Sequence, residues 1–163
     1  MCALHGGAQQ SWFRFNNLSE KQGLSDVNVA SIIKDHRGYM WFASSEGLNC
    51  YDGTTNKVYH HSNADSNSLS DDNINAIFED SRHNLWIGTR KGLNLYDTLL
   101  DNFVHFFHDP KNASSISSNE IWSIAEDHLH GLWIGTMGGG LNKVRSTNQA
   151  PGGKASYAFK HFV

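Results

Sequence analysis

The chain has 163 residues, of which 39% are hydrophobic, 12% aromatic and 18% charged, and its formal net charge at pH 7 is −3. That length suffices for one hydrophobic core, and the interspersed charges exclude a basic surface for nucleic acid or for a polybasic membrane contact. No run of about 18 apolar residues predicts a membrane-spanning helix, and two cysteines, Cys2 and Cys50, imply no disulfide framework and no cysteine metal site.

Residues 1–10 lack the charged segment and the full apolar core of an intact signal peptide. Ala8, a small residue before two glutamines, resembles a cleavage site. This segment is therefore expected to be either a signal-peptide remnant or a disordered terminus. Residues 11–26 are expected to form an extra N-terminal strand over Ser11–Phe15 and a link to the first repeat.

One phrase then occurs three times. Residues 41–49 read WFASSEGLN, residues 86–94 read WIGTRKGLN and residues 133–142 read WIGTMGGGLN. The tryptophans that begin these phrases are 45 and then 47 residues apart. Self-similarity at this period is typical of β-propellers and related repeat arrays.

Each copy reads as four short strands bounded by Gly, Asn, Asp and Ser. The first strand ends at an aspartate, the second carries the tryptophan, the third contains Gly-Leu-Asn and the fourth is aromatic. The turn between the first two strands needs positive φ, which suits Gly38. His83 and His130 replace this glycine in the other copies, and histidine tolerates left-handed geometry better than most residues.

The recurring residues are expected to be structural, since an aspartate that opens a turn binds its own backbone and a buried tryptophan fills a core. The structural repeat residues are Trp41, Trp86, Trp133, Asp35, Asp80, Asp127, Gly47, Gly92 and Gly140.

These patterns predict an all-β fold, a partial β-propeller of about three four-stranded antiparallel blades at residues 27–61, 62–108 and 109–163. Propellers close with about four to eight blades, so the chain is expected to be a fragment or a truncated gene product rather than a piece that closes by oligomerising. Its end blades are expected to pack on neighbouring blades of a parent sensor or on a second copy.

The repeats resemble the two-component regulator propeller repeat, Ser-Leu-Ser-x-Asn-x-Ile-x-x-Ile-x-x-Asp-x-x-Gly-x-Leu-Trp-Ile-Gly-Thr-x-x-Gly-Gly-Leu-Asn-x-Tyr-Asp. Gly23-Leu24-Ser25, Ser68-Leu69-Ser70 and Ile116-Ser117-Ser118-Asn119 open the three copies, and His108-Asp109-Pro110 matches the link between repeats. The resemblance covers about residues 11–145. The second and third copies depart at the turn glycine, and the third lacks the Tyr-Asp pair.

The resemblance implies the extracytoplasmic sensing half of a bacterial hybrid histidine kinase or diguanylate cyclase, and therefore a periplasmic location. In such proteins a membrane helix and a cytoplasmic catalytic half follow. Kinase or cyclase activity would then belong to a parent protein, and this chain is expected not to be an enzyme.

Ten histidines raise the question of a metal site. His60-His61, expected in an outer strand, and the pair His128 and His130, expected in a turn, are the best candidates, but no acidic or cysteine partner stands at a recognisable ligand spacing. Asp71-Asp72-Asn73 lacks the spaced ligands and the glycine of a calcium loop. No structural metal is therefore expected, at His36 or at the other candidates, and no cofactor.

A ligand site is expected around the central channel, on the face that carries the links between blades and the loops between second and third strands. Residues that differ between copies can provide specificity on a rigid scaffold, and polar groups beside an aromatic ring suit a polysaccharide-derived or other polar small ligand. The residues expected to contact it are Asn73, Asn75, Arg90, Glu120 and Trp122.

The sequence thus favours a non-catalytic, ligand-sensing propeller segment of an extracytoplasmic sensor in two-component or cyclic-dinucleotide signalling. The alternative is a structural protein-interaction module without a small ligand. A carbohydrate-active propeller enzyme is disfavoured, because glycoside hydrolysis uses two carboxylates at a defined separation and a recurring turn aspartate does not supply them.

Overall fold

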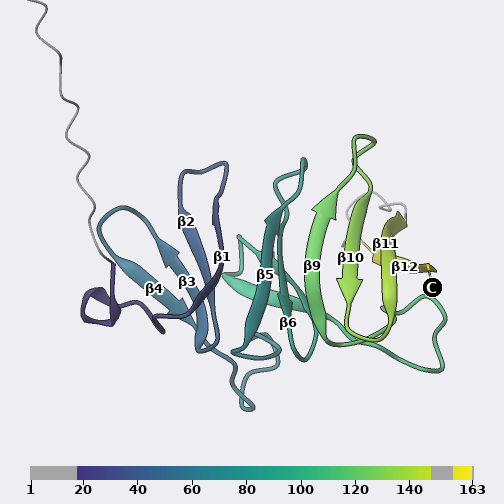
Figure 1. Ribbon diagram of the computed structural model, residues 1–163, viewed down its shortest axis with the longest axis horizontal. Helices are drawn as coiled ribbons and strands as arrows, with labels where there is room; N and C mark the ends of the chain where they lie inside the picture. The colour runs from purple at the N-terminus through teal and green to yellow at the C-terminus, as the bar shows by residue number, and fades with distance from the viewer. Residues whose placement is uncertain (1–17, 148–155, 163) are drawn as a thin grey trace, which may run out of the picture.

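The computed structural model describes residues 18–147 and 156–162. The expected N-terminal remnant (1–10) and extra strand (11–15) therefore lie outside the described residues. A short 3-10 turn, η1 (Glu20–Gln22), precedes three four-stranded antiparallel sheets that follow one another along the chain (Figure 1). The predicted all-β partial propeller of three four-stranded blades is confirmed. In the part of the chain that the structure describes, no helix has the length and apolar character needed to cross a membrane.

Within each sheet the strands lie side by side in chain order. The first sheet consists of β1 (Val29–Lys34), β2 (Met40–Ser44), β3 (Gly47–Tyr51) and β4 (Asn56–Tyr59). The second consists of β5 (Ile74–Glu79), β6 (Leu85–Thr89), β7 (Leu93–Asp97) and β8 (Asn102–Phe106). The third consists of β9 (Ile121–Glu126), β10 (Leu132–Thr136), β11 (Gly140–Thr147) and β12 (Ser156–Phe162). Because β4 ends at Tyr59, His60-His61 lie just after the outer strand, whereas the sequence predicted them within it.

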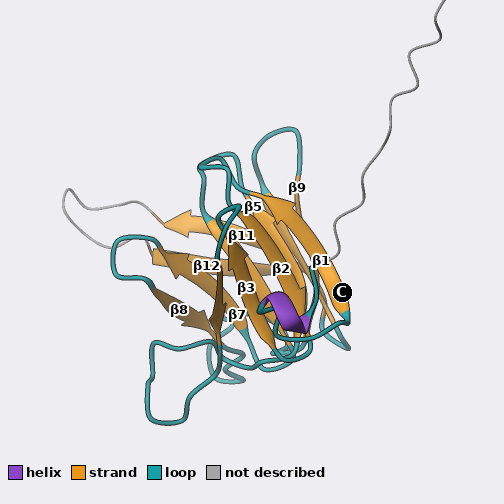
Figure 2. Cartoon of the chain, turned by 90° about the vertical axis from the view of Figure 1, so that its left-hand side faces the viewer, coloured by secondary structure: helices purple, strands orange, loops and turns teal. Residues whose placement is uncertain are grey.

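The core lies between sheets, which is why one blade alone cannot bury its faces. Trp41 of β2, fully buried, belongs to one cluster with Leu69 of the link between the sheets and with Ile87 and other apolar residues of the second sheet. Trp86 of β6, 1% exposed, packs in the same way with residues of the third sheet. Figure 2, which looks along the stack from the first sheet, shows the sheets lying one behind another.

Trp133 of β10 is only half-buried. By its place in the repeat it lies on the outer side of the third sheet, which no further sheet covers among the described residues. Phe162 lies against it at 5.1 Å between ring centroids, and Lys143 Nζ lies 4.8 Å from its ring centroid. The repeat thus places each tryptophan toward the following blade.

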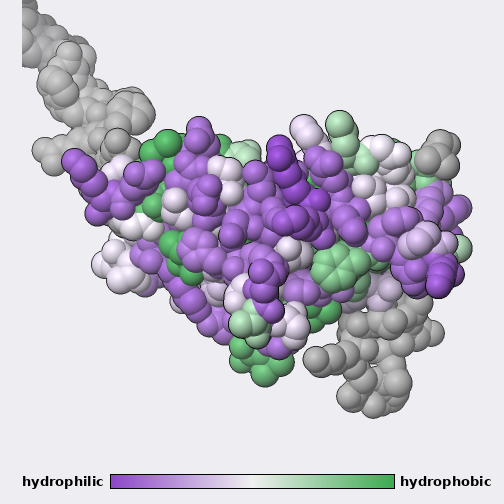
Figure 3. Space-filling view, turned by 90° about the horizontal axis from the view of Figure 1, so that it is seen from below, coloured by the Kyte–Doolittle hydropathy of each residue, from purple (hydrophilic) through white to green (hydrophobic). Residues whose placement is uncertain are grey.

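The sheets have two distinct ends, which we call the turn face and the link face. At the turn face lie the connections β1–β2, β5–β6 and β9–β10, where Gly38, His83 and His130 have φ of 96°, 64° and 60°, as the sequence predicts. At the link face, the links between sheets meet the turns after β2, β6 and β10. There the N–H of Arg90 donates to the carbonyl of Asn73 at 3.1 Å, and the equivalent bond in the third blade joins Met137 to Glu120. The N–H of Gly47, in the first blade, instead donates to the carbonyl of Asp72 in the link that leads to the second sheet. Seen from below, from this link end, the surface is largely hydrophilic (Figure 3).

Candidate functional site

The first strand of each sheet has an irregularity at its second residue. In β5 the pairing with β6 shifts register between Ile74 and Ala76, so Asn75 lies at a β-bulge. Ala30 of β1 and Trp122 of β9 occupy the equivalent bulge positions. A bulge redirects a side chain and is frequent beside binding sites. Near the link face, the same bulge position thus holds Ala30 in the first blade, Asn75 in the second and Trp122 in the third.

Asn75 and Trp122 were expected in loops, and this part of the expectation is wrong. Both strands begin one residue earlier, at Ile74 and Ile121, because these isoleucines are almost fully buried and pair with the ends of β6 and β10. The predicted residues therefore belong to rigid strands at the edge of the link face.

Asn75 joins the second sheet to the third. Its side-chain Nδ2 donates a hydrogen bond of 2.8 Å to the backbone carbonyl of Ile121. Ile121 lies between Glu120 and Trp122 in the chain. Asn75 thus holds β5 against the two site residues predicted in the third sheet, and its first role in the structure is to fix their position.

Trp122 is 54% exposed, which is unusual for so large an apolar side chain. Its Nε1 donates to Glu120 Oε1 at 3.3 Å. The backbone carbonyl of Glu120 accepts a bond of 2.9 Å from the N–H of Met137. The pair presents an apolar ring face beside a carboxylate, and this combination can stack on a sugar ring while accepting hydrogen bonds from its hydroxyls.

Asn73 and Arg90 form the neighbouring pair on the second sheet, through the backbone bond at the link face. Arg90 is exposed. The adjacent Lys91 instead pairs with Asp71 at 2.7 Å, and the hydrogen bond to Asp71 raises the pKa of Lys91. Among the described residues the guanidinium of Arg90 has no ion-pair partner, so its charge is available to a ligand.

A groove of about 440 Å³ lies beside Asn73 and Asn75, between the first and second sheets. Asn73 and Asn75 form one wall, and Val27–Ala30 with Ser45 form the other. Hydrogen bonds, first from the Ser45 hydroxyl and then from the Asn28 backbone, lower the pKa of Asp26 beside the groove. The groove is thus lined by polar and apolar residues in similar measure, and one ionised carboxylate lies next to it.

The structure therefore brings the five predicted residues to one face in two pairs, with Asn75 between them. We name this set the link-face strip, which comprises Asn73, Asn75, Arg90, Glu120 and Trp122. Its assignment as a ligand site stays a prediction.

The turn face contains contacts that the sequence did not predict. Asp80 accepts the backbone N–H groups of Arg82 and Asn84 through Oδ1, as expected of a turn aspartate, but its Oδ2 accepts the indole N–H of Trp86 at 2.9 Å. The same bond joins Asp127 to Trp133 at 2.7 Å. Bonds from Trp133 and then Lys143 hold the pKa of Asp127 well below its ordinary value.

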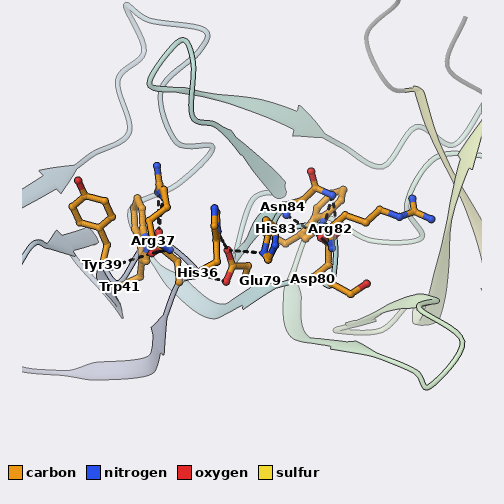
Figure 4. Close-up of polar contacts among 12 residues, drawn as sticks. His36, Arg37, Tyr39, Trp41, Glu79, Asp80, Arg82, His83 and Asn84 are labelled. Carbon is orange, nitrogen blue, oxygen red and sulfur yellow. Dashed lines mark hydrogen bonds and ion pairs between the residues drawn. The ribbon is translucent and has the colours of Figure 1, made fainter. Parts of the chain in front are cut away.

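The constant offset of six residues between aspartate and tryptophan was the signal for this bond. A second missed feature is a cluster of His36, Glu79 and His83 between the first two sheets (Figure 4). His36 and Glu79 are 43 residues apart, so no local motif shows it.

Comparisons with known proteins agree with this architecture. The family model described as "Two component regulator propeller" matches residues 23–46, 68–91 and 115–138. The crystal structure of the extracellular domain of BT3049 from B. thetaiotaomicron, described as a hybrid two component system, superposes with a TM-score of 0.76 at 29% identity. The match covers 90% of this chain and 20% of that one.

Two further relatives are similar. The extracellular domain of BT4673 from the same organism, described as a one component system, has a TM-score of 0.63 at 28% identity, over 80% of this chain and 19% of that one. "Histidine kinase P4" of Formosa agariphila is 39% identical over 61 residues, which are 37% of this chain and 4% of the kinase. The chain thus spans about a fifth of the solved relatives and a small part of the kinase.

Proposed function

Because the chain belongs to the two-component regulator propeller repeat family, we propose that it is a ligand-sensing segment of an extracytoplasmic bacterial sensor and performs no catalysis itself. The solved relatives are extracellular domains of signalling systems, which supports a periplasmic or cell-surface location. A histidine kinase or cyclase output would belong to a longer protein, since this chain spans only a small part of its kinase relative.

The observation that carries the proposal is the exposed Trp122 at a β-bulge beside Glu120. The strand sets the backbone of Trp122 and the bond to Glu120 orients its indole, so less conformational entropy is lost when a ligand stacks on it. Arg90 and Asn73 supply a cation and an amide on the neighbouring sheet. The proposed ligand is an oligosaccharide, for which an apolar ring face and adjacent polar groups are the suitable chemistry.

Binding across two sheets gives a route to a signal. The link-face strip takes residues from both the second and third sheets, and Asn75 already ties them through Ile121. A ligand that contacts both sheets would favour one relative placement of the blades over others. Such a shift is how a domain without an active site can pass on a binding event.

The proposal includes that the chain does not hydrolyse the sugar it binds. Glu120 is the only carboxylate in the link-face strip, whereas glycoside hydrolysis uses a pair. The turn aspartates are at the other face and are committed to tryptophan and backbone donors. This supports the interpretation of the strip as a binding surface.

A protein-interaction module is the second candidate, and one observation favours it. The outer side of the third sheet exposes Leu141 and Phe162 at 48% and 38%, next to the half-buried Trp133. Exposed apolar residues in one group are typical of a protein contact.

The test is a panel of neutral and acidic oligosaccharides, screened by thermal shift and confirmed by titration calorimetry, with chromatography of the sugar after long incubation. We expect at least one sugar to raise the melting temperature and to be recovered intact. Recovery of shortened sugar would overturn the non-catalytic assignment. Binding by no member of the panel, together with capture of a protein through the third sheet, would favour the second candidate.

A further inference from the structure

Three side chains that can ligate a metal meet at the turn face, between the first and second sheets. His36 lies in the β1–β2 turn, Glu79 is the last residue of β5, and His83 lies in the β5–β6 turn. One ligand atom from each lies within 4.8 Å of the other two. Figure 4 shows His36, Glu79 and His83 between Arg37 of the β1–β2 turn and Asp80, which precedes the β5–β6 turn.

The carboxylate of Glu79 is directed at both histidines. The backbone N–H of His36 donates to Glu79 Oε2 at 2.9 Å, and His36 Nδ1 lies 2.5 Å from Oε1. His83 Nδ1 lies 3.8 Å from the same Oε1. The two imidazole rings stack with centroids 4.1 Å apart and planes at 28°. Two imidazole rings and one carboxylate therefore share one small volume.

We propose that His36, Glu79 and His83 bind a divalent transition-metal ion, with zinc as the best match, and that the ion joins the first blade to the second. Imidazole nitrogen and carboxylate oxygen are ordinary zinc ligands, and two histidines with one glutamate form a known ligand set. Three protein ligands leave a fourth position for water or for an exogenous group.

The geometry requires only a small closure. Tetrahedral zinc with bonds of about 2.0–2.1 Å places its ligand atoms about 3.4 Å apart, so atoms now within 4.8 Å must approach by about 1.4 Å at most. His36 Nδ1 and Glu79 Oε1, now 2.5 Å apart, must instead separate by about 0.9 Å. The side chains of His36 and His83 are 38% and 60% exposed, so their rings can rotate without disturbing the core. Glu79, 15% exposed, is the fixed member of the set.

The boundary between the second and third sheets supplies an internal comparison. There Ser81 occupies the place of His36, and its N–H and hydroxyl donate to Glu126 at 3.1 and 2.7 Å. His130, in the place of His83, lies 3.8 Å from Glu126. The hydrogen bond from the backbone N–H to the glutamate therefore occurs at both boundaries between sheets. Of these two boundaries, the first has a histidine, His36, that completes a group of three metal ligands.

This inference departs from the expectation, drawn from sequence spacing, that His36 binds no metal. The ligands come from two consecutive repeats and meet only because adjacent turns lie side by side. It is independent of the proposed sensing function, since the cluster lies at the face opposite the link-face strip.

The experiment uses the full chain, stripped with EDTA, desalted and titrated with zinc chloride by calorimetry. We expect one zinc per chain, and a rise in melting temperature of about 5–10 °C at a hundredfold excess over Kd. Cobalt chloride should give the visible absorption bands of a tetrahedral site, and zinc should displace them.

Matched variants locate the site. His36→Ser copies the residue of the second blade, and His83→Gly copies the residue of the first blade at a positive φ. Both should abolish the zinc-induced shift while melting in EDTA within a few degrees of the wild type. His130→Gly, at the equivalent turn of the third blade, should bind zinc as the wild type does. Ser81→His should raise the stoichiometry from one zinc to two.

Several results would overturn the proposal. One is the absence of zinc binding up to near-millimolar concentration in the wild type. Another is binding that persists unchanged in both His36→Ser and His83→Gly, which would locate the ion elsewhere, for example at Cys2. A third is a loss of the zinc-induced rise in melting temperature in His130→Gly as large as in His36→Ser and His83→Gly, which would show that this rise does not report binding at the cluster.

Discussion

Trp86 and Asp80 are joined by a hydrogen bond of 2.9 Å from the indole nitrogen to the carboxylate, within one blade and at the boundary with the next. Asp35 and Trp41 make the same bond at 3.0 Å. The aspartate fixes the turn through its other oxygen, so one side chain sets both the turn and the orientation of the largest core residue. The bond explains why aspartate and tryptophan recur together at a constant offset.

Trp86→Ala should lower the free energy of unfolding by about 3–5 kcal/mol, as expected for truncation of a buried aromatic residue. Trp133→Ala should cost clearly less, because Trp133 is half-buried while Trp86 is 1% exposed. Urea denaturation followed by circular dichroism measures both. A loss below about 1 kcal/mol for Trp86→Ala would contradict its place in the core.

The contacts of Asp101 predict how the stability of the protein changes at acidic pH. It accepts hydrogen bonds of 2.7 Å from Tyr59 of the first sheet and from Tyr96 of the second, and it pairs with Lys57. Burial alone would raise its pKa, but the hydrogen bond from Lys57 and those from the tyrosines outweigh this and lower the pKa to about 2. The carboxylate therefore stabilises the contact between blades when it is ionised.

Since the pKa of Asp101 is lower in the folded than in the unfolded chain, its contribution is complete above about pH 4 and disappears as the pH falls through about 2. Asp101→Asn, which suits the positive φ of 55° at this position, should lose stability near neutral pH and lose less than the wild type on acidification. Urea midpoints at about pH 6 and pH 2 measure this. Parallel acid dependence in the two proteins would show that Asp101 does not act in this way.

The sequence was sufficient for the fold because the repeat is a strong constraint. The copies share the spacing of their apolar residues, aspartate, tryptophan and Gly-Leu-Asn, and each has a turn at the same place, so the three sheets and the positive φ at His83 and His130 follow from pattern alone. The half-burial of Trp133 also follows once each tryptophan is known to face the next blade.

Contacts between repeats could not be predicted in the same way. The cluster of His36, Glu79 and His83 depends on how two neighbouring turns sit, and spacing rules for metal ligands describe ligands within one local segment. The bulges at Asn75 and Trp122 result from the register of strand pairing, and the identity of these two residues does not predict that register. The predicted binding residues were selected by their variation among copies, and only the structure shows that Asn75 also joins two sheets.

The outer side of the third sheet should make this chain self-associate. Leu141, Phe162 and Trp133 are exposed or half-buried there, and apolar surface of this kind is stabilised by a partner. Sedimentation velocity should show association that increases with concentration. Phe162→Glu should weaken it, whereas Phe107→Glu, a substitution of another exposed phenylalanine outside this group, should not. A monodisperse monomer at high concentration would contradict this prediction.

Ligand binding should depend on the link-face strip. For any oligosaccharide that stabilises the chain, Trp122→Ala should weaken binding by about tenfold or more, because the stacking surface and its bond to Glu120 are lost. Arg90→Ala should weaken it to a smaller extent, since an exposed cation contributes less than a stacked ring. Neither change should alter stability by more than about 0.5 kcal/mol, because both side chains are exposed.

The matched control for that experiment is Tyr39→Ala, which removes another exposed aromatic ring but at the turn face. Its Kd should equal that of the wild type in calorimetry. The prediction fails if binding is untouched by Trp122→Ala and Arg90→Ala and is instead lost on changing Tyr39 or His83. That pattern would place the ligand at the turn face, where Asp80 and its tryptophan anchor the blade, and would leave the link-face strip as an ordinary solvated edge.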